Sequence, residues 1–149
     1  MPDELEQLLD EAFHGPAWHG PSLWSTLKGV TWKEALWRPA PGRNTIWELV
    51  LHAAYGKHLV RRRLTGGDGS TFPRPLRKAW WPRVPAEPDA AAWRADLALL
   101  RDCHEHLTEA VRRPRRAARR HVVGIALHDT YHGGQIRLLR RLAAADGVR

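Results

Sequence analysis

The 149-residue sequence has a single cysteine, Cys103, and no long run of apolar residues. One cysteine cannot form an internal disulfide, and it excludes a zinc site built from several thiolates. The chain also lacks a transmembrane stretch and the charged, then hydrophobic, amino terminus of a signal peptide. We therefore expect one soluble, cytoplasmic domain over residues 1–149, without a membrane partner.

Lysine is scarce as well, so the formal net charge of +8 comes almost wholly from arginine. A basic surface favours an anionic partner, such as nucleic acid or a small acidic molecule. The densest basic segment is Arg112–Arg120, which lacks interleaved aromatic residues and any recognised nucleic-acid motif. A solvated loop is its simplest interpretation, an anion site for an acidic cofactor is the next, and nucleic-acid binding is the weakest.

Apolar periodicity predicts helices, and no segment alternates with period two for long enough to predict a strand. Thr45 and Glu48 have capping-box spacing at the start of a long helix, as do Thr31 and Glu34 at the start of a short turn. The predicted helices cover residues 3–13 with a continuation at 22–27, 45–64, 89–111 and 119–144. These elements predict an all-α four-helix bundle, and the long irregular connection at residues 68–88 could cross one end of it.

Two histidines in the last predicted helix, His128 and His132, are four residues apart and therefore share one face. Ile125 and Ile136 lie on the same face, so both imidazoles point towards the core. His52 also points inward from the 45–64 helix. Neutral imidazole is a good ligand for zinc or nickel, and three protein ligands leave a position open for water or a thiolate.

More ordinary interpretations compete with a metal site. A single inward histidine is more often a hydrogen-bonded core residue, and Asp129 occupies the place of the metalloprotease glutamate in His-x-x-x-His. Asp129 could orient a ligating imidazole, but it lies about 100° from the histidine face, where a salt bridge or solvent exposure is equally reasonable. Glu48 is expected to cap its helix rather than to bind metal. His121 faces inward and is a candidate spare ligand.

Several other residues carry weaker expectations. Tyr131, next to His132, could donate a hydrogen bond to a substrate. His104 and His106 are two residues apart, which splays them on a helix, so we expect both to face solvent. Trp80 and Trp81, in the irregular connection, could line a pocket mouth or a dimer surface. Three glycines of the last helix indicate close helix packing or room for a substrate, namely Gly124, Gly133 and Gly134.

Two segments, RPAPGRNTIWELVLH at Arg38–His52 and HDTYHGGQI at His128–Ile136, resemble the DinB/YfiT-like superfamily. The resemblance covers nearly the whole chain. It implies a four-helix bundle with a crossover connection and a divalent metal ion held by His52, His128 and His132. Members of this superfamily include transferases and isomerases that use a low-molecular-weight thiol such as bacillithiol or mycothiol.

The resemblance therefore implies a metal-dependent thiol S-transferase or hydrolase with an anionic thiol as cosubstrate. A homodimer is expected from the same resemblance and from the abundant aromatic residues. Two functions from other classes stay open. One is a non-enzymatic, stress-related metal-binding module, and the other, weaker one is a basic nucleic-acid-binding protein.

Overall fold

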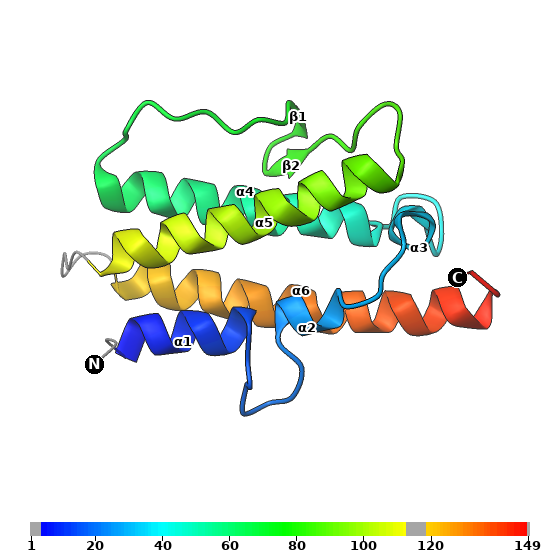
Figure 1. Ribbon diagram of the computed structural model, residues 1–149, viewed down its shortest axis with the longest axis horizontal. Coiled ribbons are helices and arrows are strands. Elements are labelled where there is room, and N and C mark those ends of the chain that lie inside the picture. Colours follow the sequence, from blue (N-terminus) through cyan, green and yellow to red (C-terminus); the bar gives the residue numbers. More distant parts are fainter. Residues whose placement is uncertain (1–3, 113–118, 149) are drawn as a thin grey trace.

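The computed structural model describes residues 4–112 and 119–148. In this part of the chain, four long helices form a bundle (Figure 1), namely α1 (Glu4–Phe13), α4 (Ile46–Thr65), α5 (Ala90–Val111) and α6 (Arg119–Ala145). Two short helices, α2 (Leu23–Thr26) and α3 (Trp32–Leu36), lie between α1 and α4. The predicted all-α bundle is confirmed. The basic segment Arg112–Arg120 falls mostly outside the described residues.

The order of the helices in space requires a crossover (Figure 1). Helices α4 and α5 run in the same direction along the bundle, whereas α1 and α6 run in the opposite direction. The chain between α4 and α5 therefore returns along the length of the bundle before α5 begins. This arrangement confirms the crossover connection, although the connection follows the side of the bundle rather than only its end.

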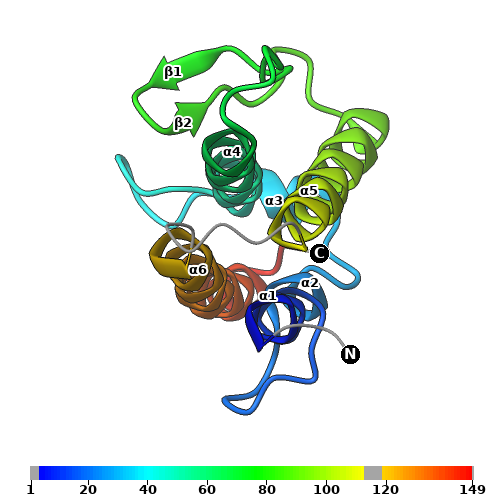
Figure 2. The ribbon, with the colours of Figure 1, turned by 90° about the vertical axis from the view of Figure 1, so that its left-hand side faces the viewer.

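A small hairpin lies within this connection and corrects the expectation that the chain has no strands. Strands β1 (Leu76–Lys78) and β2 (Trp81–Pro82) are antiparallel, with Leu76 opposite Pro82 and Lys78 opposite Trp81. Such short strands cannot produce a detectable period of two. Trp80, at the turn, has a φ of 69°, and β2 packs on α4 (Figure 2).

Local signals in the sequence set the ends of α4. The Thr45 hydroxyl accepts from the backbone N–H of Glu48, and the Glu48 carboxylate accepts from the N–H of Thr45, which completes the predicted capping box. Gly66 ends the helix in the left-handed region, with a φ of 80°. The second expected box is half formed, because the Glu34 carboxylate accepts a hydrogen bond from Arg140 instead of the Thr31 backbone N–H.

Helix α4 is buried on several sides, since it contacts α3, α5, α6 and β2. Its first half, Ile46–Ala54, is buried throughout. Helices α1 and α2 both pack against α6, separated by the proline- and glycine-rich segment 14–21. None of the helices in the described residues is long and apolar enough to span a lipid bilayer.

Candidate metal centre

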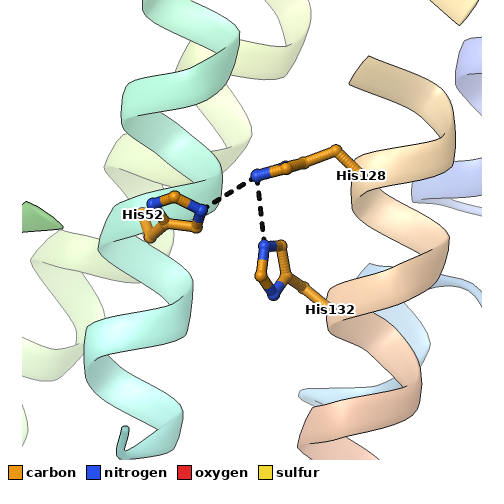
Figure 3. Close-up of side chains that lie close together, drawn as sticks. All are labelled: His52, His128 and His132. Carbon is orange, nitrogen blue, oxygen red and sulfur yellow. Dashed lines mark hydrogen bonds between the residues drawn. The ribbon is translucent and has the colours of Figure 1, made fainter. Parts of the chain in front are cut away.

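Three imidazole rings from two antiparallel helices converge inside the bundle (Figure 3). His52 projects from α4, while His128 and His132 project from successive turns of α6. The Nε2 atom of His128 lies 2.9 Å from Nε2 of His52 and 3.1 Å from Nε2 of His132. Each of the three rings thus directs its Nε2 atom towards one point, and the three Nε2 atoms could hold a metal ion there.

The outer nitrogens of two rings are occupied by hydrogen-bond acceptors. Nδ1 of His52 donates to the backbone carbonyl of Trp80 at 2.7 Å, and Nδ1 of His132 donates to the side-chain carbonyl of Gln135 at 2.6 Å. A neutral imidazole carries one N–H, so a proton on Nδ1 leaves a lone pair on Nε2. Both rings are therefore fixed in the tautomer and orientation that a metal ligand needs.

A divalent cation fits this set of donors better than a proton does. If His128 carried its proton on Nε2, that N–H could donate to the lone pair of only one neighbouring ring. The Nε2 lone pair of the other ring would then have no partner. The Nδ1 atom of His128 is also buried and has no hydrogen-bond partner among the described residues. Metal–nitrogen bonds of about 2.0–2.1 Å in tetrahedral geometry separate ligand nitrogens by roughly 3.3 Å, so the rings need only a slight expansion to bind an ion.

Burial keeps the three rings neutral. Burial, and to a smaller extent the neighbouring His132, His52 and Lys57 side chains, together lower the pKa of His128 to about 3. Burial also lowers the pKa of His52 and of His132, against the opposing effect of their hydrogen bonds to Trp80 and Gln135. Neutral imidazole is the form that binds metal, so the site needs no deprotonation step at neutral pH.

The hairpin forms an aromatic wall beside His52. The Trp81 ring stacks on the His52 ring, with centroids 4.1 Å apart and planes 9° apart. Trp80 supplies its carbonyl to His52, while its own side chain is more than half exposed and lies near Tyr55. The sequence predicted a pocket mouth or a dimer surface for this tryptophan pair; its contacts with His52 carried no sequence signal.

Glycine makes room for one of the rings. A Cβ atom on Gly56 of α4 would lie 3.4 Å from Cε1 of His128 and 3.2 Å from Cδ1 of Ile125. Of the α6 glycines, Gly133 lies against the backbone of Leu23, as close helix packing predicts. No described atom outside the local helix lies within 4 Å of the Cβ position at Gly124 or at Gly134.

A buried ion pair joins the two helices that carry the histidines. The Lys57 ammonium of α4 donates to the Asp129 carboxylate of α6, and both side chains are fully buried. Among the options for Asp129, solvent exposure is wrong, and the structure shows an ion pair. Since breaking a buried pair leaves an uncompensated charge, this contact fixes the register of α4 against α6.

A second cluster of potential ligands is formed by Asp10, His14 and His104. His104 is buried rather than exposed, which corrects the prediction, because its ring stacks on Phe13 with centroids 3.9 Å apart. Its Nδ1 lies 3.4 Å from the Lys57 ammonium, which can only donate. The proton of neutral His104 is therefore on Nε2, and its one lone pair, on Nδ1, already faces the ammonium group.

The remaining predicted residues occupy other places. Tyr131 is exposed, with its ring centroid 5.1 Å from that of His132. Glu48 serves the helix cap and accepts two hydrogen bonds from Arg38, as expected of a structural carboxylate. His121 is partly buried and is not part of the three-histidine cluster.

Comparison with known proteins gives one match. The family model described as the DinB superfamily matches residues 17–136, which include all three converging histidines. No curated protein and no solved structure matches the chain significantly. The match covers most of the sequence, and the helical bundle agrees with it. The chain belongs to the DinB superfamily.

Proposed function

We propose that His52, His128 and His132 bind one divalent metal ion through their Nε2 atoms, and that the protein is a metal-dependent enzyme. The observation that carries this proposal is the state of the outer nitrogens. His52 and His132 each donate from Nδ1 to a fixed acceptor, so both Nε2 lone pairs point at one place. Zinc and nickel are among the ions that neutral imidazole binds well, and we propose one of them as the bound ion.

The residues around the ion would shield it from water and contact the substrate. Trp81 covers one side of His52 and excludes water there, and Tyr131 places a phenol at the exposed rim. Three protein ligands leave a coordination position for a substrate. A divalent ion in such a site supplies Lewis-acid polarisation of a donor atom such as a thiol sulfur.

The reaction we propose is S-transfer from a low-molecular-weight thiol of the bacillithiol or mycothiol type. One support is membership of the DinB superfamily, because the sequence resemblance to that superfamily implies such thiols. The other is the net charge of +8, which attracts an anionic cosubstrate. In this reaction the sulfur forms a bond to an electrophilic carbon, the leaving group departs with its electron pair, and the thiol proton passes to solvent.

Elemental analysis of protein purified without a metal-affinity tag tests the metal proposal. We expect about one equivalent of metal in the wild type and in His14→Ala, a matched change in the second cluster. His52→Ala and His132→Ala should hold less than a tenth of that amount. If both retain the wild-type content, the three-histidine site is wrong.

Conjugation of bacillithiol or mycothiol to a chloromethyl fluorogenic electrophile tests the reaction separately. The metal-loaded wild type should accelerate conjugation, and the metal-free His132→Ala variant should not. A wild type that holds metal but never accelerates conjugation with either thiol would instead support a non-enzymatic metal-binding module.

A further inference from the structure

A hollow of about 620 Å³ lies between the hairpin segment and the first turn of α4. Three arginines of the hairpin segment line it, namely Arg74, Arg77 and Arg83, and Glu48 of α4 lines it as well. Its volume is within the range of about 300–1,000 Å³ that small-molecule sites occupy. We call this space the arginine hollow.

Two buried carboxylates fix guanidinium groups in and behind the wall of the arginine hollow. Asp96 is 1% exposed and accepts hydrogen bonds from Nε and Nη2 of Arg74, at 2.9 and 2.7 Å, while its other oxygen accepts from the Trp47 indole. Glu48 accepts two hydrogen bonds from Arg38, at 3.1 and 3.0 Å, in addition to the bond of its capping box. Arg74 and Arg38 are therefore held in place before any ligand binds, which lowers the entropic cost of binding.

The other two arginines keep their donors available for a ligand. Nη2 of Arg77 lies 3.8 Å from Oε1 of Glu48, which is too long for a hydrogen bond. Within residues 4–112 and 119–148, no carboxylate oxygen lies within 4 Å of the Arg83 guanidinium. The Arg83 backbone N–H donates to the Pro75 carbonyl at 2.8 Å, so the base of this side chain is fixed across the hairpin segment.

The charge around the arginine hollow is not balanced. Four guanidinium groups line it or contact its wall, whereas the carboxylates that contact them are Glu48 and Asp96. Burial raises the pKa of Glu48, but hydrogen bonds from Arg38 and the Thr45 N–H, together with the charges of Arg38 and Arg77, lower it overall, so this carboxylate stays ionised at neutral pH. Two positive charges are left over, and one doubly charged anion would neutralise them.

The rest of the wall is apolar. Pro75, Pro82 and Pro85 line the hollow together with Val84 and Ala86. Proline has no backbone N–H and holds φ near −65°, so these residues offer contact area and keep the segment in one shape. An inorganic ion would leave most of this wall uncovered, whereas an organic molecule with an anionic head would contact it.

We propose that the arginine hollow binds a small organic dianion, with a phosphate monoester or two carboxylates, through the guanidinium groups of Arg77 and Arg83. Planar guanidinium groups bind both kinds of oxyanion with paired hydrogen bonds. The site is separate from the metal centre, because none of the three converging histidines lines it. It is nevertheless a neighbour of that centre, since Glu48 lies one helical turn before His52.

Isothermal titration calorimetry of the full chain with phenyl phosphate and with succinate tests the site. At about pH 7.5 and low salt, where both probes are dianions, at least one should bind with a dissociation constant below about 1 mM. Arg77→Gln and Arg83→Gln should each weaken that binding at least tenfold. Both positions are exposed, so the melting temperature should change by less than about 2 °C.

Two control variants separate this site from other causes of anion binding. Arg63→Gln removes the same charge at an exposed position near the other end of α4 and should change the affinity less than about twofold. His132→Ala, which alters the metal centre, should bind the dianion as the wild type does. Equal weakening by Arg63→Gln and Arg83→Gln would mean that net charge alone attracts the anion, and it would overturn the proposal.

Two further outcomes would also overturn it. If His132→Ala abolished binding, the dianion would be a ligand of the metal centre. If neither probe bound the wild type at up to about 10 mM, the hollow would have no affinity for dianions of this size. Binding of phenyl phosphate alone would assign the phosphate monoester as the ligand class, and binding of succinate alone would assign the dicarboxylate.

Discussion

The chain contains two clusters of histidine that look alike in composition but differ in what holds their outer nitrogens. In the cluster of His52, His128 and His132, carbonyl oxygens accept the outer protons of two rings, so their lone pairs point inward. In the cluster of Asp10, His14 and His104, an ammonium group faces the outer nitrogen of His104. The group behind each ring, rather than the number of histidines, therefore separates a candidate metal site from a packed core residue.

Charge sharpens the contrast between the two clusters. Lys57 places its positive charge directly against His104, which with burial lowers the pKa of that ring to about 2 and also repels a cation. The same lysine is neutralised on its other side by Asp129, whose backbone position is next to His128. One buried ion pair thus joins the two helices that carry the first cluster and places a positive charge against the second.

The largest expected effect is the loss of a ligand. His52→Ala or His132→Ala should weaken zinc affinity at least 1,000-fold, because only two imidazoles remain, while His14→Ala should change it less than twofold. Competition titration against a chromogenic chelator measures both. If His14→Ala and His132→Ala lost equal zinc affinity, both clusters would contribute to zinc binding and the proposed difference between them would be wrong.

The next effect concerns the hydrogen bond behind a ligand. Gln135→Leu removes the acceptor of the His132 Nδ1 proton and should weaken metal affinity 10- to 100-fold. Gln7→Leu, in the hollow beside His14 and His104, is the matched control and should have no effect. The same chelator competition reports both variants, and an unchanged affinity for Gln135→Leu would mean that this bond does not orient the ring.

The pH dependence of stability should come from both clusters in the metal-free protein. Folding lowers the pKa of His104 to about 2 and that of His128 to about 3, from an ordinary value near 6.5. The unfolded chain then binds protons that the folded chain cannot, so stability is complete above about pH 6.5 and falls as the pH drops.

Each such histidine contributes a slope of about 1.4 kcal/mol per pH unit below pH 6.5. Urea unfolding at pH 7, 6 and 5 should show His104→Gln with a slope shallower by that amount. His106→Gln, at an exposed position on the same helix, should keep the wild-type slope. A His104→Gln slope equal to that of the wild type would mean that His104 is protonated in the folded state.

The smallest effect tests the space around His128. A Cβ on Gly56 would lie 3.2 Å from Cδ1 of Ile125, which would have to shift by a few tenths of an ångström, and would only touch Cε1 of His128 at 3.4 Å, so Gly56→Ala should weaken metal affinity by no more than about threefold. Gly124→Ala, where the structure leaves open space, should leave the affinity unchanged. Chelator competition at one pH distinguishes the two variants.

Much of the bundle and the grouping of the histidines follows from local sequence. The capping box at Thr45 and the glycine at Gly66 set the ends of α4, and a 100° rotation per residue placed His128 and His132 on one face. These features depend on neighbours within one helix. The position of His52 opposite them requires only that both helices turn their apolar faces to a common core.

The rest depends on contacts between distant segments. His104 was expected in solvent because its spacing from His106 is not helical, but the stacking of Phe13 from α1 buries it. Lys57 lies off the His52 face and is nevertheless buried, since α4 has neighbours on several sides and no fully polar face. The hydrogen bond from His52 to the Trp80 carbonyl joins backbone and ring across 28 positions, which no periodicity encodes.

The parallel course of α4 and α5 has a consequence for how this protein can change over evolutionary time. The crossover must travel about 33 Å, the length of α5, yet residues 66–89 could reach roughly 80 Å when extended. Less than half of that chain is needed to make the return. The residues that are not needed to span this distance form the hairpin that contacts His52. Insertions and replacements there can change the surroundings of His52 while the helices keep their places.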